Sequence, residues 1–136
     1  MEQADQFGLR DHAHFPGFRR DVGNFLRLFD IFVMASLEEG LCTSILDAQF
    51  FSLPVVASRV GGIPEIVRDG VQGFLVPPNN PAAMAAALRK LLESPGLRSR
   101  MGQAGRDQVL ERFTADRMVA DTVTAYDAVL EMSRKP

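Results

Sequence analysis

Two carboxylates eight positions apart, Glu39 and Asp47, are the side chains of this 136-residue chain whose type and spacing point most directly to ligand chemistry. If Glu39 lies in the first turn of a helix, a rise of about 1.5 Å per residue places Asp47 roughly 12 Å farther along the axis. That is about the reach from the sugar to the ribose of a nucleotide sugar, and carboxylates accept strong hydrogen bonds from hydroxyl groups. An ordinary amphipathic helix with an acidic start gives the same spacing, because the helix dipole favours Glu at its N-terminus.

The residues around these carboxylates have helical periodicity. They divide into a polar stripe of Gly40, Thr43 and Asp47 and an apolar stripe of Leu41, Ile45 and Ala48. One side of such a helix packs against a core while the other side holds a ligand.

Beyond this helix, short apolar runs alternate with longer helical patterns, which predicts an α/β fold with a parallel sheet covered by helices. Strands are expected at 31–35, 54–58 and 73–76, and further helices after Asp21, over 81–93, up to about Phe113 and from Thr114 onward. The run from Ile31 to Ala35 is apolar at every position, as a strand buried on both faces requires. Asn80 and Pro81 predict the N-cap and first residue of the 81–93 helix.

Seven short motifs follow one another between Phe15 and Phe113. They are FPGFRRDV (15–22), DIFVMAS (30–36), EGLCTSILDA (39–48), LPVVAS (53–58), GGIPEIV (61–67), DGVQGFLVPP (69–78) and RMGQAGRDQVLERF (100–113). In this order they resemble the carboxy-terminal half of the nucleotide-sugar domain of GT-B glycosyltransferases, specifically the large retaining group of family 4 or group 1 type. The resemblance implies a Rossmann-like parallel sheet with flanking helices.

The resemblance also implies a donor site around the two carboxylates. Glu39 is expected to be the catalytic carboxylate that faces the donor sugar, and Asp47 is expected to bind the ribose, although the family usually has Glu at this second position. The family also often has Gly where this chain has Cys42. Donor contacts are expected from Gly40, Leu41, Cys42 and Thr43. The amides of the last three are candidates for phosphate binding, because a helix N-terminus favours an anion.

Two loops have two interpretations each. Gly17, Phe18 and Arg19 match the family's loop whose main-chain groups contact the base, and the alternative is that Arg19 pairs locally with Asp21 or caps the next helix. The segment 61–65 is either a tight turn before a short helix or a loop on the ligand side.

The implied function is metal-independent transfer of a sugar, with retention, from a nucleotide diphosphate sugar to a glycan, lipid or small-molecule acceptor, without a cofactor. Residues 1–136 would be a partial carboxy-terminal domain, because the chain has no room for the acceptor-binding N-terminal domain or for the family's Arg and Lys that clamp the diphosphate. The chain alone is therefore expected to be inactive. The alternatives are a nucleotide-sugar epimerase of GT-B architecture and a non-catalytic fragment that only folds or oligomerises.

The family's strand order also implies unpaired sheet edges. A strand near His12 to Pro16 would be separated from the 31–35 strand by two strands that the chain lacks. The edge of the 31–35 strand is apolar and has no charge or Pro to discourage pairing with another strand. This predicts a homo-oligomer, or re-docking of the amino-terminal segment on that edge. His12 and His14 would share one face of that strand, but no third ligand lies near them and no metal is expected.

Composition narrows the class of protein. The net charge of -2 does not indicate a basic surface of the kind that binds nucleic acid. No apolar run is long enough for a transmembrane segment, and the first residues do not have the pattern of a signal peptide. A single cysteine agrees with a reducing compartment, so a cytoplasmic location is expected. The arginines at 98, 100, 106 and 112 are expected on a solvated helix face. A contact with anionic lipid at the inner face of the membrane is the alternative.

Overall fold

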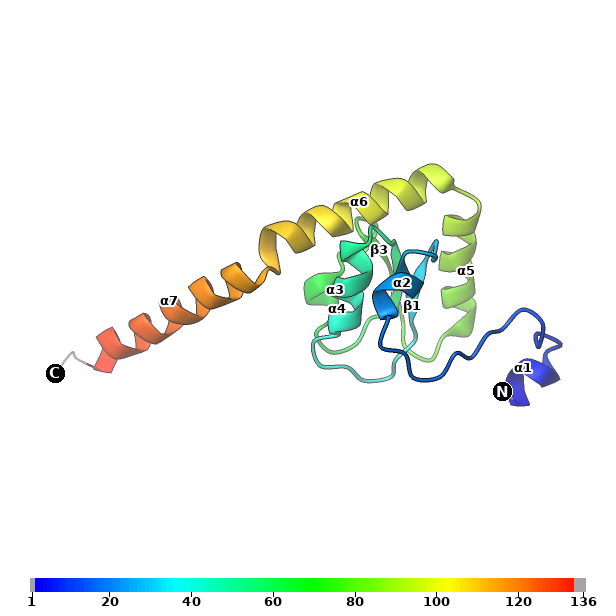
Figure 1. Ribbon diagram of the computed structural model, residues 1–136, viewed down its shortest axis with the longest axis horizontal. Helices are drawn as coiled ribbons and strands as arrows, with labels where there is room; N and C mark the ends of the chain where they lie inside the picture. The colour runs from blue at the N-terminus through cyan, green and yellow to red at the C-terminus, as the bar shows by residue number, and fades with distance from the viewer. Residues whose placement is uncertain (1, 134–136) are drawn as a thin grey trace.

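The computed structural model describes residues 2–133, which form a small parallel sheet with helices on both faces and a further helix at each end (Figure 1). The elements are α1 (Glu2–Gln6), α2 (Val22–Leu26), β1 (Phe32–Met34), α3 (Thr43–Phe50), β2 (Val55–Ser58), α4 (Ile63–Ile66), β3 (Gly73–Val76), α5 (Pro81–Leu92), α6 (Pro95–Arg112) and α7 (Ala115–Ser133). No helix within this part of the chain is both long and apolar enough to cross a membrane.

The three strands lie in the order β1-β2-β3, and both pairs are parallel. Val56 at the centre of β2 lies opposite Val33 on one side and Phe74 on the other. The three expected strands and the α/β class are therefore confirmed. All four residues of β2 are buried, because this strand is paired on both sides and covered on both faces.

Two apolar layers enclose the sheet. On one face, Ile45 of α3 and Ile63 and Ile66 of α4 pack with Val55 and Ala57 of β2 and Leu75 of β3. On the other face, Ala87 and Leu91 of α5 and Met101 of α6 pack with Val56 and Val76. Helix α5 begins as expected, since the Asn80 side chain accepts a hydrogen bond of 2.9 Å from the Ala83 amide.

Helix α6 is held close to its neighbours by small residues and by two arginines. A Cβ atom on Gly102 would lie 1.9 Å from the Ser52 carbonyl oxygen, so only glycine permits this approach. Arg98 donates hydrogen bonds of 2.7 and 3.1 Å to the carbonyls of Leu91 and Leu92 at the end of α5, and Arg106 donates to the Phe50 carbonyl at the end of α3. The expectation that all four arginines of this segment form a solvated face was therefore wrong for these two.

Two expectations for the first third of the chain were also wrong. The segment from His12 to Pro16 is not a strand, because within residues 2–133 no neighbouring strand lies beside it to complete a ladder. Strand β1 is not buried on both faces, since α5 and α6 cover β2 and β3 more fully and leave Val33 42% exposed.

Helix α7 extends away from the sheet, on the opposite side of the molecule from α1 (Figure 1). The Thr114 hydroxyl caps it by accepting a hydrogen bond of 3.2 Å from the Arg117 amide. Its side chains from 115 to 132 are exposed, including the large apolar Met118, Tyr126 and Val129.

The loops that follow β1 and β2 touch through backbone atoms. Gly61 has a φ of +50°, and a Cβ there would lie 1.6 Å from the Glu39 carbonyl oxygen. The Gly62 amide donates a hydrogen bond of 3.0 Å to the Gly40 carbonyl. Because α4 starts directly after these glycines, the turn interpretation of this segment is confirmed, and the turn supports the loop that carries Glu39.

The free edge of β1 leads to a prediction on association. Phe32 donates its amide to the Pro54 carbonyl at 3.0 Å, so the backbone groups of Val33 point away from β2, and no described segment pairs with them. Re-docking of the amino-terminal segment is therefore not observed. We expect the purified chain to self-associate and Val33→Lys to shift it toward monomer in light scattering, because a charge discourages edge pairing. Val71→Lys, at another exposed valine, is the control, and a monomeric wild-type chain would contradict the prediction.

The glycine contact leads to a prediction on stability. Gly61→Ala should lower the free energy of unfolding by about 3 kcal/mol, since it combines a strained backbone with a collision. Gly70→Ala should cost only about 1 kcal/mol, because Gly70 has a φ of +79° but its Cβ would enter open space. Urea unfolding measures both variants. Equal losses would show that the contact with the Glu39 carbonyl contributes nothing.

Candidate functional site

Helix α3 begins later than the sequence suggested. Its first residue is Thr43 and its N-cap is Cys42, so Glu39 lies in the preceding loop and not in the first helical turn. The cause is the neighbouring loop, because the Gly62 amide occupies the Gly40 carbonyl that would otherwise bond within the helix. The distance of 12 Å along a helix axis therefore does not apply to Glu39 and Asp47.

The two sides of α3 differ as expected over the helix itself. Thr43 and Asp47, one turn apart, are exposed on the same side, whereas Ile45 and Ala48 are fully buried. Leu41 does not belong to the buried side, because it precedes the helix and is 54% exposed. The structure thus brings Thr43 and Asp47 together on a solvent-facing surface.

The first turn of α3 has free backbone donors. The amides of Thr43 and Ser44 have no carbonyl one turn earlier within the helix, and no side chain caps this end. The Ile45 amide is taken by the Cys42 carbonyl at 3.1 Å. The amides of Thr43 and Ser44 are therefore available to an anion, and Ser44 was not among the contacts expected from the sequence. Leu41 and Cys42 lie ahead of the helical turn.

Cys42 is a buried packing residue, 5% exposed. Its Sγ lies 3.2 Å from the Ser44 Oγ. This contact fixes the side chain of Ser44 next to the free amides.

Glu39 is half-buried and has one hydrogen-bond donor among the described residues. The Ser36 hydroxyl donates to its Oε1 at 2.7 Å. Ser36 lies two residues after the end of β1, so the strand, the hydroxyl and the carboxylate are connected by a short segment. No sequence pattern predicts this contact, because it depends on the path of the loop.

The loop from Gly17 to Arg19 is exposed and has a turn at Gly17, whose φ is +68°. Arg19 forms a two-pronged ion pair with Asp21, with both nitrogen–oxygen distances at 2.9 Å. This pair lowers the pKa of the Asp21 carboxyl, together with a backbone hydrogen bond. The local pairing expected as the alternative is therefore present, while Phe18, which is 89% exposed, and the main-chain groups of the loop remain accessible.

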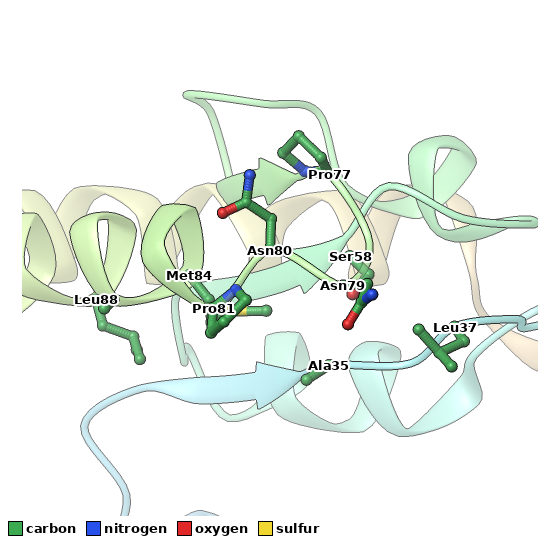
Figure 2. Close-up of a pocket in the computed structure, with 10 residues that line it drawn as sticks. Ala35, Leu37, Ser58, Pro77, Asn79, Asn80, Pro81, Met84 and Leu88 are labelled. Carbon is green, nitrogen blue, oxygen red and sulfur yellow. The ribbon is translucent and has the colours of Figure 1, made fainter.

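The carboxyl ends of all three strands border a hollow of about 400 Å³. Figure 2 shows Ala35 at the end of β1, with Ser58 from β2 and Asn79 after β3 across the hollow. This is the end of a parallel sheet at which α/β proteins bind ligands. None of the expected donor residues lines this hollow. Leu41 and Thr43 instead line a second groove of about 660 Å³, between α3 and the start of α7.

Comparison with known sequences gives one family. Residues 1–108 match the family described as Glycosyl transferases group 1. A D-inositol 3-phosphate glycosyltransferase from Streptomyces bingchenggensis is 35% identical over 134 residues, which are 97% of this chain and 29% of that protein. The chain thus spans about a third of the length of the curated relatives that it matches.

Comparison with solved structures finds the same family. Anabaena Alr3699/HepE, solved in complex with UDP, is 26% identical with a TM-score of 0.85, over 91% of this chain and 35% of that one. The C-terminal domain of LpcC from Francisella tularensis, a glycosyl transferase group 1 family protein, is 29% identical with a TM-score of 0.74, over 84% of this chain and 60% of that one. By sequence and by fold, the chain belongs to the group 1 family of glycosyl transferases and has the Rossmann-like fold of the GT-B carboxy-terminal domain.

Proposed function

We propose that this chain is the donor-binding part of a retaining glycosyltransferase that uses a nucleotide diphosphate sugar. The observation that carries the proposal is the exposed side of α3, which begins with free amides at Thr43 and Ser44 and carries the Asp47 carboxylate one turn later. The loop that leads into this helix carries a second carboxylate, Glu39. The similarity to Alr3699/HepE, which has been solved with UDP and with UDP-glucose, supports this choice of ligand.

Each part of the donor has a matching group in this proposal. The Glu39 carboxylate accepts hydrogen bonds from sugar hydroxyls, and Asp47 accepts them from the ribose. The amides of Thr43 and Ser44 donate to the diphosphate, whose negative charge is favoured by the positive end of the α3 dipole. The main chain of Gly17 and Phe18 contacts the base edge.

Catalysis needs more than these groups. A departing diphosphate is stabilised by positive charge aimed at its oxygens. No described Lys or Arg forms an ion pair with Glu39, and the cations that clamp the diphosphate in the resembled enzymes have no counterpart in the motifs of this chain. The acceptor is a glycan, lipid or small molecule bound by a domain outside these residues. No metal or cofactor takes part in this proposal, and the cytoplasmic location remains a prediction.

The chain alone is accordingly expected to transfer no sugar. It should bind nucleoside diphosphates with a Kd around millimolar, or roughly 4 kcal/mol, because only part of the donor site is present. Release of free UDP from UDP-glucose by the purified chain, above the rate of a Glu39→Gln variant, would contradict this expectation.

Asp47 gives the sharper test of the site. Asp47→Asn should weaken binding of the preferred nucleoside diphosphate by about 1.5 to 3 kcal/mol, since the charge-assisted bonds to the ribose are lost. The free energy of unfolding should stay within about 0.5 kcal/mol, because Asp47 is exposed. Ligand-detected NMR and urea unfolding measure the two effects. Asp127→Asn, an equal charge change on α7, is the control.

The opposite pattern would show that Asp47 is structural. In that case Asp47→Asn would lose stability and bind the diphosphate as the wild type does. Wild-type protein that binds none of UDP, GDP and ADP would favour the non-catalytic alternative, a fragment that only folds or oligomerises.

A further inference from the structure

We propose that Ser36 is a positioning residue that holds the Glu39 carboxylate in the orientation needed to bind the sugar of the donor. The inference rests on the proposed function, because it concerns the same site. Ser36 is not among the expected donor contacts, and its effect is confined to the sugar part of the ligand.

The Glu39 side chain has few restraints of its own. Glu39 lies in a loop ahead of α3, so neither helical packing nor a helix cap fixes its side-chain torsions. Within residues 2–133 it has no cationic partner, and the Ser36 hydroxyl is the donor to its carboxylate. Without that hydroxyl, the carboxylate would sample several rotamers, and binding would carry the cost of ordering it.

The frame that holds the hydroxyl is rigid. Ser36 follows β1 by two residues and is half-buried, so its position is tied to the sheet. On the other side, Gly61 and Gly62 contact the backbone of Glu39 and Gly40. The loop is therefore supported at its backbone by the glycines and at its side chain by Ser36.

The hydrogen bond has a defined direction. The Ser36 Oγ donates to Oε1 of Glu39 at 2.7 Å, which is a normal length for a hydroxyl and a carboxylate. Oε2 is left with its full capacity to accept hydrogen bonds from the ligand. A carboxylate held in this way presents one defined oxygen to a sugar hydroxyl, while the nucleotide binds elsewhere, at α3.

The test compares a nucleotide sugar with its own nucleoside diphosphate. The pairs are UDP-glucose and UDP, GDP-mannose and GDP, and ADP-glucose and ADP, and the pair that wild-type protein binds best is used. Binding is measured by ligand-detected NMR on wild-type protein, Ser36→Ala, Ser36→Cys and Ser36→Thr. Ser99→Ala, which removes an exposed hydroxyl from α6, is the matched control.

We expect Ser36→Ala to weaken binding of the nucleotide sugar about three- to ten-fold, as loss of pre-organisation of one side chain predicts, and to change binding of the diphosphate less than about two-fold. Ser36→Cys, which keeps the shape but donates weakly, should behave like Ser36→Ala. Ser36→Thr, which keeps the hydroxyl, should restore wild-type binding. Ser99→Ala should bind both ligands as the wild type does.

Other outcomes separate this inference from the proposed function. If Ser36→Ala and Ser36→Cys weakened binding of both ligands equally, Ser36 would be a purely structural residue. If they weakened binding of neither ligand, the hydrogen bond would have no effect on binding. Each result overturns the inference and leaves the nucleotide site intact. Wild-type protein that binds a diphosphate but gains nothing from the sugar would overturn the role of the Ser36–Glu39 pair alone. Wild-type protein that binds none of the probes would overturn the proposed function itself.

Discussion

The contact between the loops that follow β1 and β2 is the constraint on which the candidate site depends. Parallel pairing of these strands brings both loops to the same end of the sheet, where the strands finish. Only glycine fits at position 61, because any larger residue would collide with the Glu39 carbonyl. The hydrogen bond from Gly62 to Gly40 then keeps residues 39–41 out of the helix, so α3 starts at Thr43 with free amides at its exposed end.

Local signals predicted much of the fold. Strand β3 and helix α5 were expected almost at their observed boundaries. The signals for these boundaries are local: a short apolar run between turn residues for β3, and an Asn-Pro start for α5. The interior of α3 followed its periodicity for the same reason. The shared exposed side of Thr43 and Asp47 and the loop at Gly17 were likewise visible in the motifs.

Tertiary contacts account for what the sequence did not predict. The start of α3 is displaced by the loop of Gly61 and Gly62, which is distant in the sequence, and the Ser36–Glu39 hydrogen bond depends on the shape that this displacement gives to the Glu39 loop. Two buried glutamines, Gln49 and Gln108, both donate to the Ile66 carbonyl and connect α3, α4 and α6, although nothing in their local sequence distinguishes them from surface residues. The exposure of β1 and α7 likewise depends on which elements pack against them. Their own apolar sequences do not determine it.

The central claim is that a nucleoside diphosphate binds at the exposed end of α3. Titration of isotope-labelled chain with the best-binding diphosphate, followed by amide NMR, tests it most directly. The largest saturable shifts should fall on the amides of Thr43 and Ser44, accompanied by Gly17 and Phe18, and the part of helix α7 beyond Ala125 should be unaffected. Shifts confined to the hollow at Asn79 and Met84, or spread evenly over the surface, would contradict it.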